Sequence, residues 1–277
     1  MRLFGEAAPL LAESGVDLAV LADLEAAVAR SAGLPDGPRA DIHVHVGRDR
    51  DGHVLGAEEL IDDMDRWGIG RAAVFALNDP GPEGDFTDAN AAVAGGAART
   101  GARLVPFCRV DPHRNAAAAI ARAAAAGARG LKLHPVAQHF TPEAPAVIAC
   151  VARATDLGWP VLVHAGYGAR PLVPALSLLA DAVPGARLIL AHGARGDARA
   201  VRTALGRHPG VWFDTSLAAL VDLVDLPPER LIFGSDRPYG DYATGLQLVG
   251  CAARVGGWSA VQLLGVMSAN FAALVGA

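Results

Sequence analysis

Two histidines lie one residue apart in the segment Asp41-Ile42-His43-Val44-His45-Val46. Successive side chains of a strand point to opposite faces, so His43 and His45 are expected to project together while Ile42 and Val44 cover the other face. Neutral imidazole is a common ligand of divalent metals, zinc above all, and a strand holds two such rings in a fixed arrangement. The pair therefore indicates part of a metal site that needs further ligands from elsewhere in the chain.

Other side chains that bind metals or move protons follow later apolar runs of the chain. They are Arg109, Lys132, His134, His164, His192, Asp214 and Asp236. Lys132 is the single lysine among 24 basic residues. A lysine, unlike an arginine, can lose its proton, react or be modified, so this position is expected to need a primary amine.

The elements that must position these residues form a regular alternation. Short apolar runs span 41–46, 71–77, 103–110, 130–133, 160–164, 187–191, 211–214 and 230–234. Segments with helical periodicity lie between and after them, at 56–67, 87–100, 115–126, 142–157, 171–183, 197–207, 217–223 and 243–254. Continuous apolar strands covered by amphipathic helices predict an α/β fold with a parallel sheet buried on both faces. Eight strands in 277 residues match the closed (β/α)8 TIM barrel.

An open doubly wound sheet is the competing architecture. No Gly-x-Gly-x-x-Gly follows the first strand, and polar residues follow nearly every strand instead of one switch point. In a barrel the C-terminal strand ends surround one axis, so these residues are expected to converge. Residues 39–277 are thus predicted as the barrel and 1–38 as a helical N-terminal extension, whereas Asp214, with Ser216, is expected to orient the barrel top or cap the next helix.

Composition excludes several classes of partner. A formal charge of −5 and a pI near 6.0 give no overall attraction to nucleic acid or to an anionic membrane. Cys108, Cys150 and Cys251 form no CxxC pair, so they are read as reduced thiols of a cytoplasmic protein.

The last stretch of the chain, 255–277, carries no charged residue. Glycines and polar residues interrupt it and no basic flank follows, so we expect a buried terminal helix, not a membrane span. Part of this stretch, or the first helix, is expected to lie in the interface of a homodimer.

Six motifs resemble the amidohydrolase superfamily, in order along residues 39–277. They are Asp41-Ile42-His43-Val44-His45, Gly130-Leu131-Lys132-Leu133-His134-Pro135, Leu162-Val163-His164-Ala165-Gly166, Leu190-Ala191-His192-Gly193, Phe233-Gly234-Ser235-Asp236-Arg237-Pro238 and Asn270-Phe271-Ala272. Within the superfamily they are similar to the amidohydrolase-2 type, the branch of TIM-barrel metal-dependent hydrolases that also contains aminocarboxymuconate-semialdehyde and resorcylate-type decarboxylases.

The resemblance implies a metal held by His43, His45, His164 and Asp236, with His192 as a catalytic group beside the metal-bound water. Three imidazole nitrogens and a carboxylate suit Zn2+ with an open position for water. His192 and Asp236 are then expected to accept and return protons.

The role of Lys132 stays open among three alternatives. In binuclear members of the superfamily the corresponding lysine is carboxylated and bridges two metals. Lys132 could instead be a cation that binds substrate, or a general acid. We favour one metal ion with Lys132 contacting substrate, and His134, two residues further, is expected to lie on the same face and bind substrate too.

The substrate class is inferred from arginines that follow the strands, Arg48, Arg109, Arg170, Arg195 and Arg237. Guanidinium groups around one rim favour a small anionic substrate, in particular one with a carboxylate. The alternative is that acidic residues of the first two loops pair with several of these arginines.

Three functions are consistent with these residues. The first is a metal-dependent hydrolase in which metal-activated water attacks the carbonyl of an amide, lactone or ester. The second is a metal-dependent non-oxidative decarboxylase, a lyase that uses the same ligands. The third is an inactive metal-binding scaffold, which the intact set from His43 to Asp236 disfavours.

Overall fold

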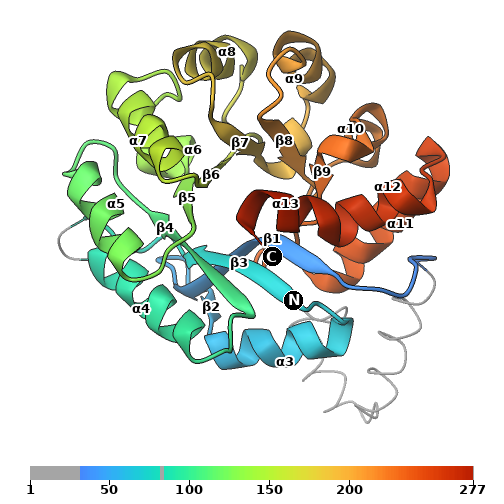
Figure 1. Cartoon of the computed structure of the whole chain (residues 1–277), viewed down its shortest axis with the longest axis horizontal. Helices are drawn as coiled ribbons and strands as arrows, with labels where there is room; N and C mark the ends of the chain where they lie inside the picture. Colours follow the sequence, from blue (N-terminus) through green and yellow to red (C-terminus); the bar gives the residue numbers. More distant parts are fainter. Residues whose placement is uncertain (1–31, 82–83, 277) are drawn as a thin grey trace.

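The computed structural model describes residues 32–81 and 84–276. Most of the predicted helical extension, residues 1–31, lies outside this range. The fold is a TIM barrel with an outer ring of helices (Figure 1).

In the described residues the barrel wall consists of eight parallel strands, as predicted. They are β1 (Ala40–Arg48), β3 (Arg71–Ala76), β4 (Leu104–Arg109), β5 (Gly130–Leu133), β6 (Pro160–Val163), β7 (Arg187–Leu190), β8 (Val211–Asp214) and β9 (Leu231–Ile232). A ninth, two-residue strand, β2 (Val54–Leu55), pairs antiparallel with the end of β1. The sheet order is β2-β1-β3-β4-β5-β6-β7-β8-β9, so each parallel strand neighbours the next one along the chain.

Three backbone hydrogen bonds join β1 to the segment around and after β9. Ile42 N donates to Phe233 O at 2.9 Å, Asp236 N to His43 O at 2.8 Å, and His45 N to Arg237 O at 2.7 Å. These bonds close the curled sheet and hold the chain after β9 against the middle of β1.

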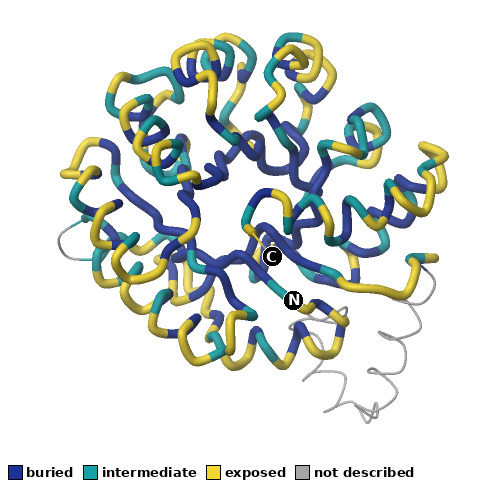
Figure 2. The backbone as a smooth tube through the Cα atoms, viewed as in Figure 1, coloured by how far each residue is buried: buried dark blue, intermediate teal, exposed yellow. Residues whose placement is uncertain are grey.

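Most of the helices surround the wall and form the partly exposed outer layer, whereas α13 (Asn270–Val275) lies across one end of the barrel (Figures 1 and 2). They are α3 (Ala57–Trp67), α4 (Thr87–Ala98), α5 (Ala116–Ala125), α6 (Pro135–Gln138), α7 (Pro145–Asp156), α8 (Val173–Ala182), α9 (Ala198–Leu205), α10 (Leu220–Asp225), α11 (Tyr242–Gly256), α12 (Ala260–Leu264) and α13 (Asn270–Val275). The four-residue α6, directly after β5, is too short to leave a periodic pattern and was not predicted.

Capping residues determine where several helices begin and end. The Asp241 side chain accepts a hydrogen bond from Thr244 N at 2.8 Å and begins α11, and Gly257, with φ of 62°, ends it. Ser259 and Gln262 form a reciprocal capping box at the start of α12.

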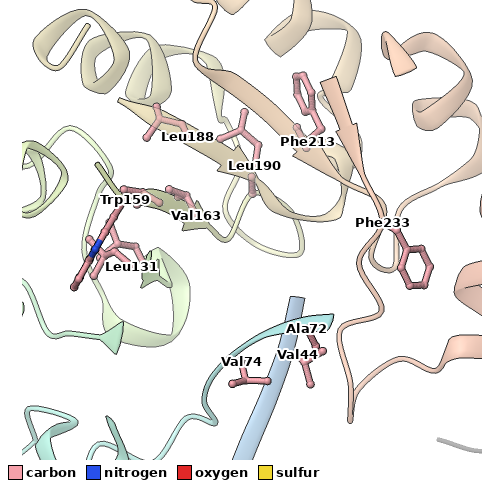
Figure 3. Close-up of a cluster of buried hydrophobic side chains, with 14 of the residues drawn as sticks. Val44, Ala72, Val74, Leu131, Trp159, Val163, Leu188, Leu190, Phe213 and Phe233 are labelled. Carbon is pink, nitrogen blue, oxygen red and sulfur yellow. The ribbon is translucent and has the colours of Figure 1, made fainter. Parts of the chain in front are cut away.

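Apolar side chains form two clusters on either side of the wall. The outer cluster lies between strands and helices and includes Leu131, Val163 and Leu190 (Figure 3). The smaller inner cluster fills the barrel and includes Phe75 and Phe107. Apolar side chains therefore pack against both faces of the sheet, as continuous apolar strands predict.

The alternation predicted for β1 is wrong at one residue. Ile42 belongs to the inner cluster, whereas Val44 belongs to the outer one. The pairing of β1 with β3 shifts register between Asp41 and Val44, and this irregularity breaks the period of two.

The uncharged C-terminal stretch is not one buried helix. It consists of α12, a π-helical turn at Gly265–Ala269 and α13, and Val261 is 80% exposed. Phe271 and Leu274 of α13 enter the inner cluster, so this helix closes the barrel floor. Among the residues that the structure describes, no helix combines the length and apolarity that crossing a bilayer requires.

We predict that Asp41→Ala destabilises the barrel. Its buried carboxylate accepts hydrogen bonds from Ser235 Oγ, from Ser235 N at 3.1 Å and from His43 N at 2.9 Å, which ties β1 to the chain after β9. Loss of these bonds should lower the free energy of unfolding by about 3 kcal/mol in denaturant titrations. The exposed Asp62→Ala is the control, with an expected change below about 0.5 kcal/mol, and equal effects of the two substitutions would contradict the assignment.

Candidate metal centre

A cavity of about 370 Å³ opens at the C-terminal ends of the barrel strands. This volume lies within the usual range for small-molecule sites. Eight of the residues singled out from the sequence line it, namely His43, His45, Arg109, Lys132, His134, His164, His192 and Asp236. The barrel thus brings together residues from β1, β4, β5, β6, β7 and β9 or from the loops that follow them.

The strongest candidate for a metal site is the group of His43, His45 and Asp236. One ligand atom from each lies within 4.8 Å of the others, and all three residues are buried. The Nε2 atoms of both histidines are 3.1 Å from Asp236 Oδ1. Asp236 Oδ1 is nevertheless a buried oxygen without a hydrogen-bond partner among the described residues. Two imidazole nitrogens and an unsatisfied carboxylate oxygen fit a divalent metal ion.

The protonation states of Asp236 and His45 also fit a metal. Burial raises the pKa of Asp236, but His43 and His45 outweigh it and hold that pKa well below its usual range. Burial lowers the pKa of His45 to about 3, so its ring is neutral. An ionised carboxylate and a neutral imidazole are the forms that ligate metals.

Asp214 orients His43. Its Oδ2 accepts a hydrogen bond from His43 Nδ1 at 2.8 Å, which leaves the lone pair on Nε2 and directs that atom toward Asp236. Asp214 Oδ1 accepts from His192 N, Ser216 N and Ser216 Oγ. A carboxylate that holds a histidine in this way is a common partner of metal-binding imidazoles.

A second group that could hold a metal consists of His43, His192 and Asp214. Both oxygens of Asp214 already accept hydrogen bonds, and His43 Nδ1 carries the proton it donates. The group with Asp236 is therefore the better site for an ion.

His192 lies beside the candidate site with its ring fixed. Its Nδ1 is 2.9 Å from Ser216 O, and because a carbonyl only accepts, Nδ1 carries the proton and Nε2 is the basic nitrogen. Nε2 is 3.1 Å from His164 Nδ1. His192 also adopts a left-handed conformation, with φ of 60°, in the helical turn after β7. Such a backbone conformation, at a residue whose side chain faces a cavity, is typical of functional positions.

His164, predicted as the fourth ligand, is not grouped with His43, His45 and Asp236. It packs between His192 and His134, and its ring is stacked on that of His134 with centroids 4.0 Å apart. The structure therefore groups three candidate ligands, and His164 remains a prediction as the fourth.

Lys132 is fully buried and touches the metal site. Its Nζ is 3.2 Å from His43 Nε2 and 4.8 Å from the centroid of the Phe75 ring. Burial lowers its pKa to about 7, and Arg109 contributes to the same shift. An amine that is partly unprotonated at neutral pH can donate, accept or be modified.

His134 presents one defined nitrogen to the cavity. Its Nδ1 accepts a hydrogen bond from Ala137 N at 3.2 Å and so caps α6. Nε2 therefore carries the proton of the neutral ring and can donate to a ligand.

Of the five predicted substrate-binding arginines, Arg109 lines the cavity. Two others pair with carboxylates elsewhere: Arg237 binds Asp63 in a buried ion pair, and Arg170 binds Asp197 at 2.6 Å. Such ion pairs were the alternative to substrate binding for these arginines. The acidic partners were expected in the first two loops, whereas Asp63 lies in α3 and Asp197 at the start of α9.

The remaining two arginines lie outside the cavity lining. Arg195 stacks over Tyr167, with its guanidinium carbon 4.8 Å from the ring centroid, and donates to Leu217 O. Arg48 is exposed and borders a separate pocket between β1 and α4.

The sequence reasoning missed two tyrosines at the cavity mouth. Tyr239 donates to Asp49 Oδ2 at 2.6 Å and meets the His45 ring edge-on at 5.2 Å. Tyr167 follows His164 by three residues and meets the His192 ring edge-on at 5.4 Å. Each tyrosine follows a predicted metal ligand, Asp236 or His164, by three residues, and this spacing could have indicated that it lies near the site.

One known protein family matches more than half of the chain. The family described as Amidohydrolase matches residues 40–262. No curated protein sequence matches the chain.

Solved structures with the same fold include three with low sequence identity. An uncharacterized TIM-barrel protein from Bordetella bronchiseptica has a TM-score of 0.69 at 14% identity, covering 86% of this chain and 98% of its own. A probable 2-pyrone-4,6-dicarboxylic acid hydrolase from Acinetobacter baumannii has a TM-score of 0.64 at 15% identity, covering 86% and 99%. A 2,6-dihydroxybenzoate decarboxylase from Rhizobium has a TM-score of 0.65 at 15% identity, covering 87% and 99%.

We predict that Asp214→Asn weakens metal binding by about 10- to 100-fold, because His43 loses the carboxylate that fixes its tautomer and orientation. Competition with a chromophoric chelator measures the affinity. Asp197→Asn, which removes a carboxylate bound to the exposed Arg170, is the control and should leave the affinity unchanged. Wild-type affinity in Asp214→Asn would show that Asp214 does not support the ligand set.

Proposed function

The chain belongs to the amidohydrolase family and is an enzyme. From this premise we propose that it hydrolyses a bond between a carbonyl carbon and a nitrogen or oxygen atom in a small anionic substrate. The observation that carries the proposal is the buried, unpartnered Asp236 Oδ1 at 3.1 Å from the Nε2 atoms of His43 and His45. A basic nitrogen, His192 Nε2, lies in the same cavity. The substrate bond is an amide, lactone or ester.

We infer that the ion is a single Zn2+, because two imidazoles and a carboxylate with an open position are typical of catalytic zinc. When bound, such an ion polarises a carbonyl and lowers the pKa of water from about 16 to roughly 7. Two ions would require a carboxylated Lys132, and we keep the simpler assignment of one ion with Lys132 Nζ 3.2 Å from His43 Nε2.

The protein residues then divide the proton transfers. His192 Nε2 takes a proton from the attacking water while the water oxygen bonds to the carbonyl carbon. The bond from that carbon to nitrogen or oxygen breaks, and His192 returns the proton to the leaving atom, either directly or by way of the Asp236 carboxylate. Lys132 and the Nε2–H of His134 contact the substrate from the β5 side of the cavity.

Non-oxidative decarboxylation is the second candidate, since one similar structure is a 2,6-dihydroxybenzoate decarboxylase. That protein and the 2-pyrone-4,6-dicarboxylic acid hydrolase both act, by name, on carboxylate-bearing compounds, which supports an anionic substrate. A homodimer and a cytoplasmic location stay predictions. Sizing with light scattering tests the first, and a monomer at micromolar concentration would contradict it.

The reaction class is tested with zinc-loaded protein, H2-18O and a panel of small carboxylate-bearing amides, esters and lactones. We expect 18O in the acid product, and we expect His192→Asn to lower kcat/KM by at least about 100-fold at unchanged zinc content. Release of carbon dioxide without 18O incorporation would establish the lyase instead. Turnover that survives complete chelation of the metal would contradict both reactions.

A further inference from the structure

Arg109 is a buried cation without a counter-ion in the part of the chain that the structure describes. Its side chain is 0% exposed, and among the described residues no carboxylate lies within ion-pair distance of the guanidinium. Buried charges are normally paired, because a charge that loses its hydration and gains no partner destabilises the folded protein. Arg237, the other buried arginine of this barrel end, follows that rule through Asp63. Within residues 32–81 and 84–276, Arg109 therefore has no carboxylate partner.

The donors of Arg109 are only partly used. Nε donates to Gln138 Oε1 at 3.3 Å, Nη1 to Ala76 O at 3.3 Å and Nη2 to Asn78 Oδ1 at 2.9 Å. A guanidinium has five N–H groups, so one N–H on each terminal nitrogen is left without an acceptor among these residues. Two such donors match the two oxygens of a carboxylate.

The surroundings fix Arg109 in place. Asn90 clamps its backbone, since Nδ2 donates to Arg109 O at 2.8 Å and Arg109 N donates to Oδ1 at 2.9 Å. The Phe86 ring lies 4.8 Å from the guanidinium carbon. Gln138 is held by its own bond to Val110 O at 2.6 Å. A cation ordered before a ligand arrives binds an anion without further loss of side-chain entropy.

Arg109 and Lys132 lie on neighbouring strands of the wall, and Lys132 in turn contacts the candidate metal site. Arg109 pairs in register with Lys132 across β4 and β5, and Lys132 Nζ is 3.2 Å from His43 Nε2. All of these residues line the same cavity. A molecule spanning the cavity can thus place one group at Arg109 and another at the ligand set.

We propose that Arg109 is the specificity-determining residue of the cavity and binds a carboxylate of the substrate that takes no part in bond breaking. The substrate class is a small molecule with a carboxylate separate from its hydrolysable carbonyl, a choice that rests on the proposed hydrolysis. Asn78, Gln138 and Phe86 set the orientation of the guanidinium and have no counterpart at the metal site. The carboxylate at Arg109 is therefore retained in the product.

The test uses benzoate, a small monocarboxylate without a hydrolysable bond, and its neutral analogue benzamide. Isothermal titration of the zinc-loaded protein is expected to show benzoate binding that weakens at least about tenfold in Arg109→Gln and in Asn78→Asp. Asn78→Asp keeps the side-chain shape and supplies an internal counter-ion, so it should fold at least as well as wild type. Arg202→Gln removes an exposed arginine paired with Asp225 and should leave the affinity within about twofold.

Three outcomes would overturn the proposal. They are equal benzoate affinity in wild type and Asn78→Asp, no benzoate binding to wild type at millimolar concentration, and loss of benzoate binding after chelation of the metal. The last would place the carboxylate on the ion. Zinc content is measured on the same samples to separate the carboxylate site at Arg109 from the proposed zinc-dependent hydrolysis. Protein that holds no zinc but still binds benzoate through Arg109 would refute only the proposed function.

Discussion

The hydrogen bonds between β1 and the chain after β9 are the constraint on which the site depends. His43 and His45 lie on β1, and Asp236 lies almost two hundred residues later in the sequence, so these groups meet only because the sheet closes. One of the closing bonds runs from Asp236 N to His43 O. Closure and assembly of the ligand set are therefore the same event, and the left-handed conformation of Asp236, with φ of 59°, is held by that contact.

Buried charge distinguishes the two halves of the cavity. Around β1, β8 and β9 the carboxylates of Asp214 and Asp236 face imidazoles, so anionic groups are gathered where a cation binds. Around β4 and β5 Lys132 and Arg109 are buried with no carboxylate at ion-pair distance among the described residues. This separation of charge suits a substrate with an electrophilic carbonyl at one end and a negative group at the other.

The barrel and most of the cavity lining were predictable, because parallel strands leave continuous apolar runs and their C-terminal ends must surround one axis. What was missed depends on contacts between distant residues. Asp214 was expected to orient the barrel top, but only the folded chain shows that it holds His43, and only the folded chain shows that Arg237 pairs with Asp63. The register shift that moves Ile42 to the inner cluster likewise depends on pairing with β3, not on local sequence.

Anomalous diffraction at the zinc edge, on crystals of zinc-loaded protein, tests the ligand set most directly. We predict one peak bonded to Nε2 of His43, Nε2 of His45 and a carboxylate oxygen of Asp236, at about 2.0 to 2.2 Å from each. The same map shows whether His164 supplies a fourth ligand and whether Lys132 carries a carbamate. A peak held by Asp214, or no peak among His43, His45 and Asp236 in fully loaded protein, would contradict the central claim.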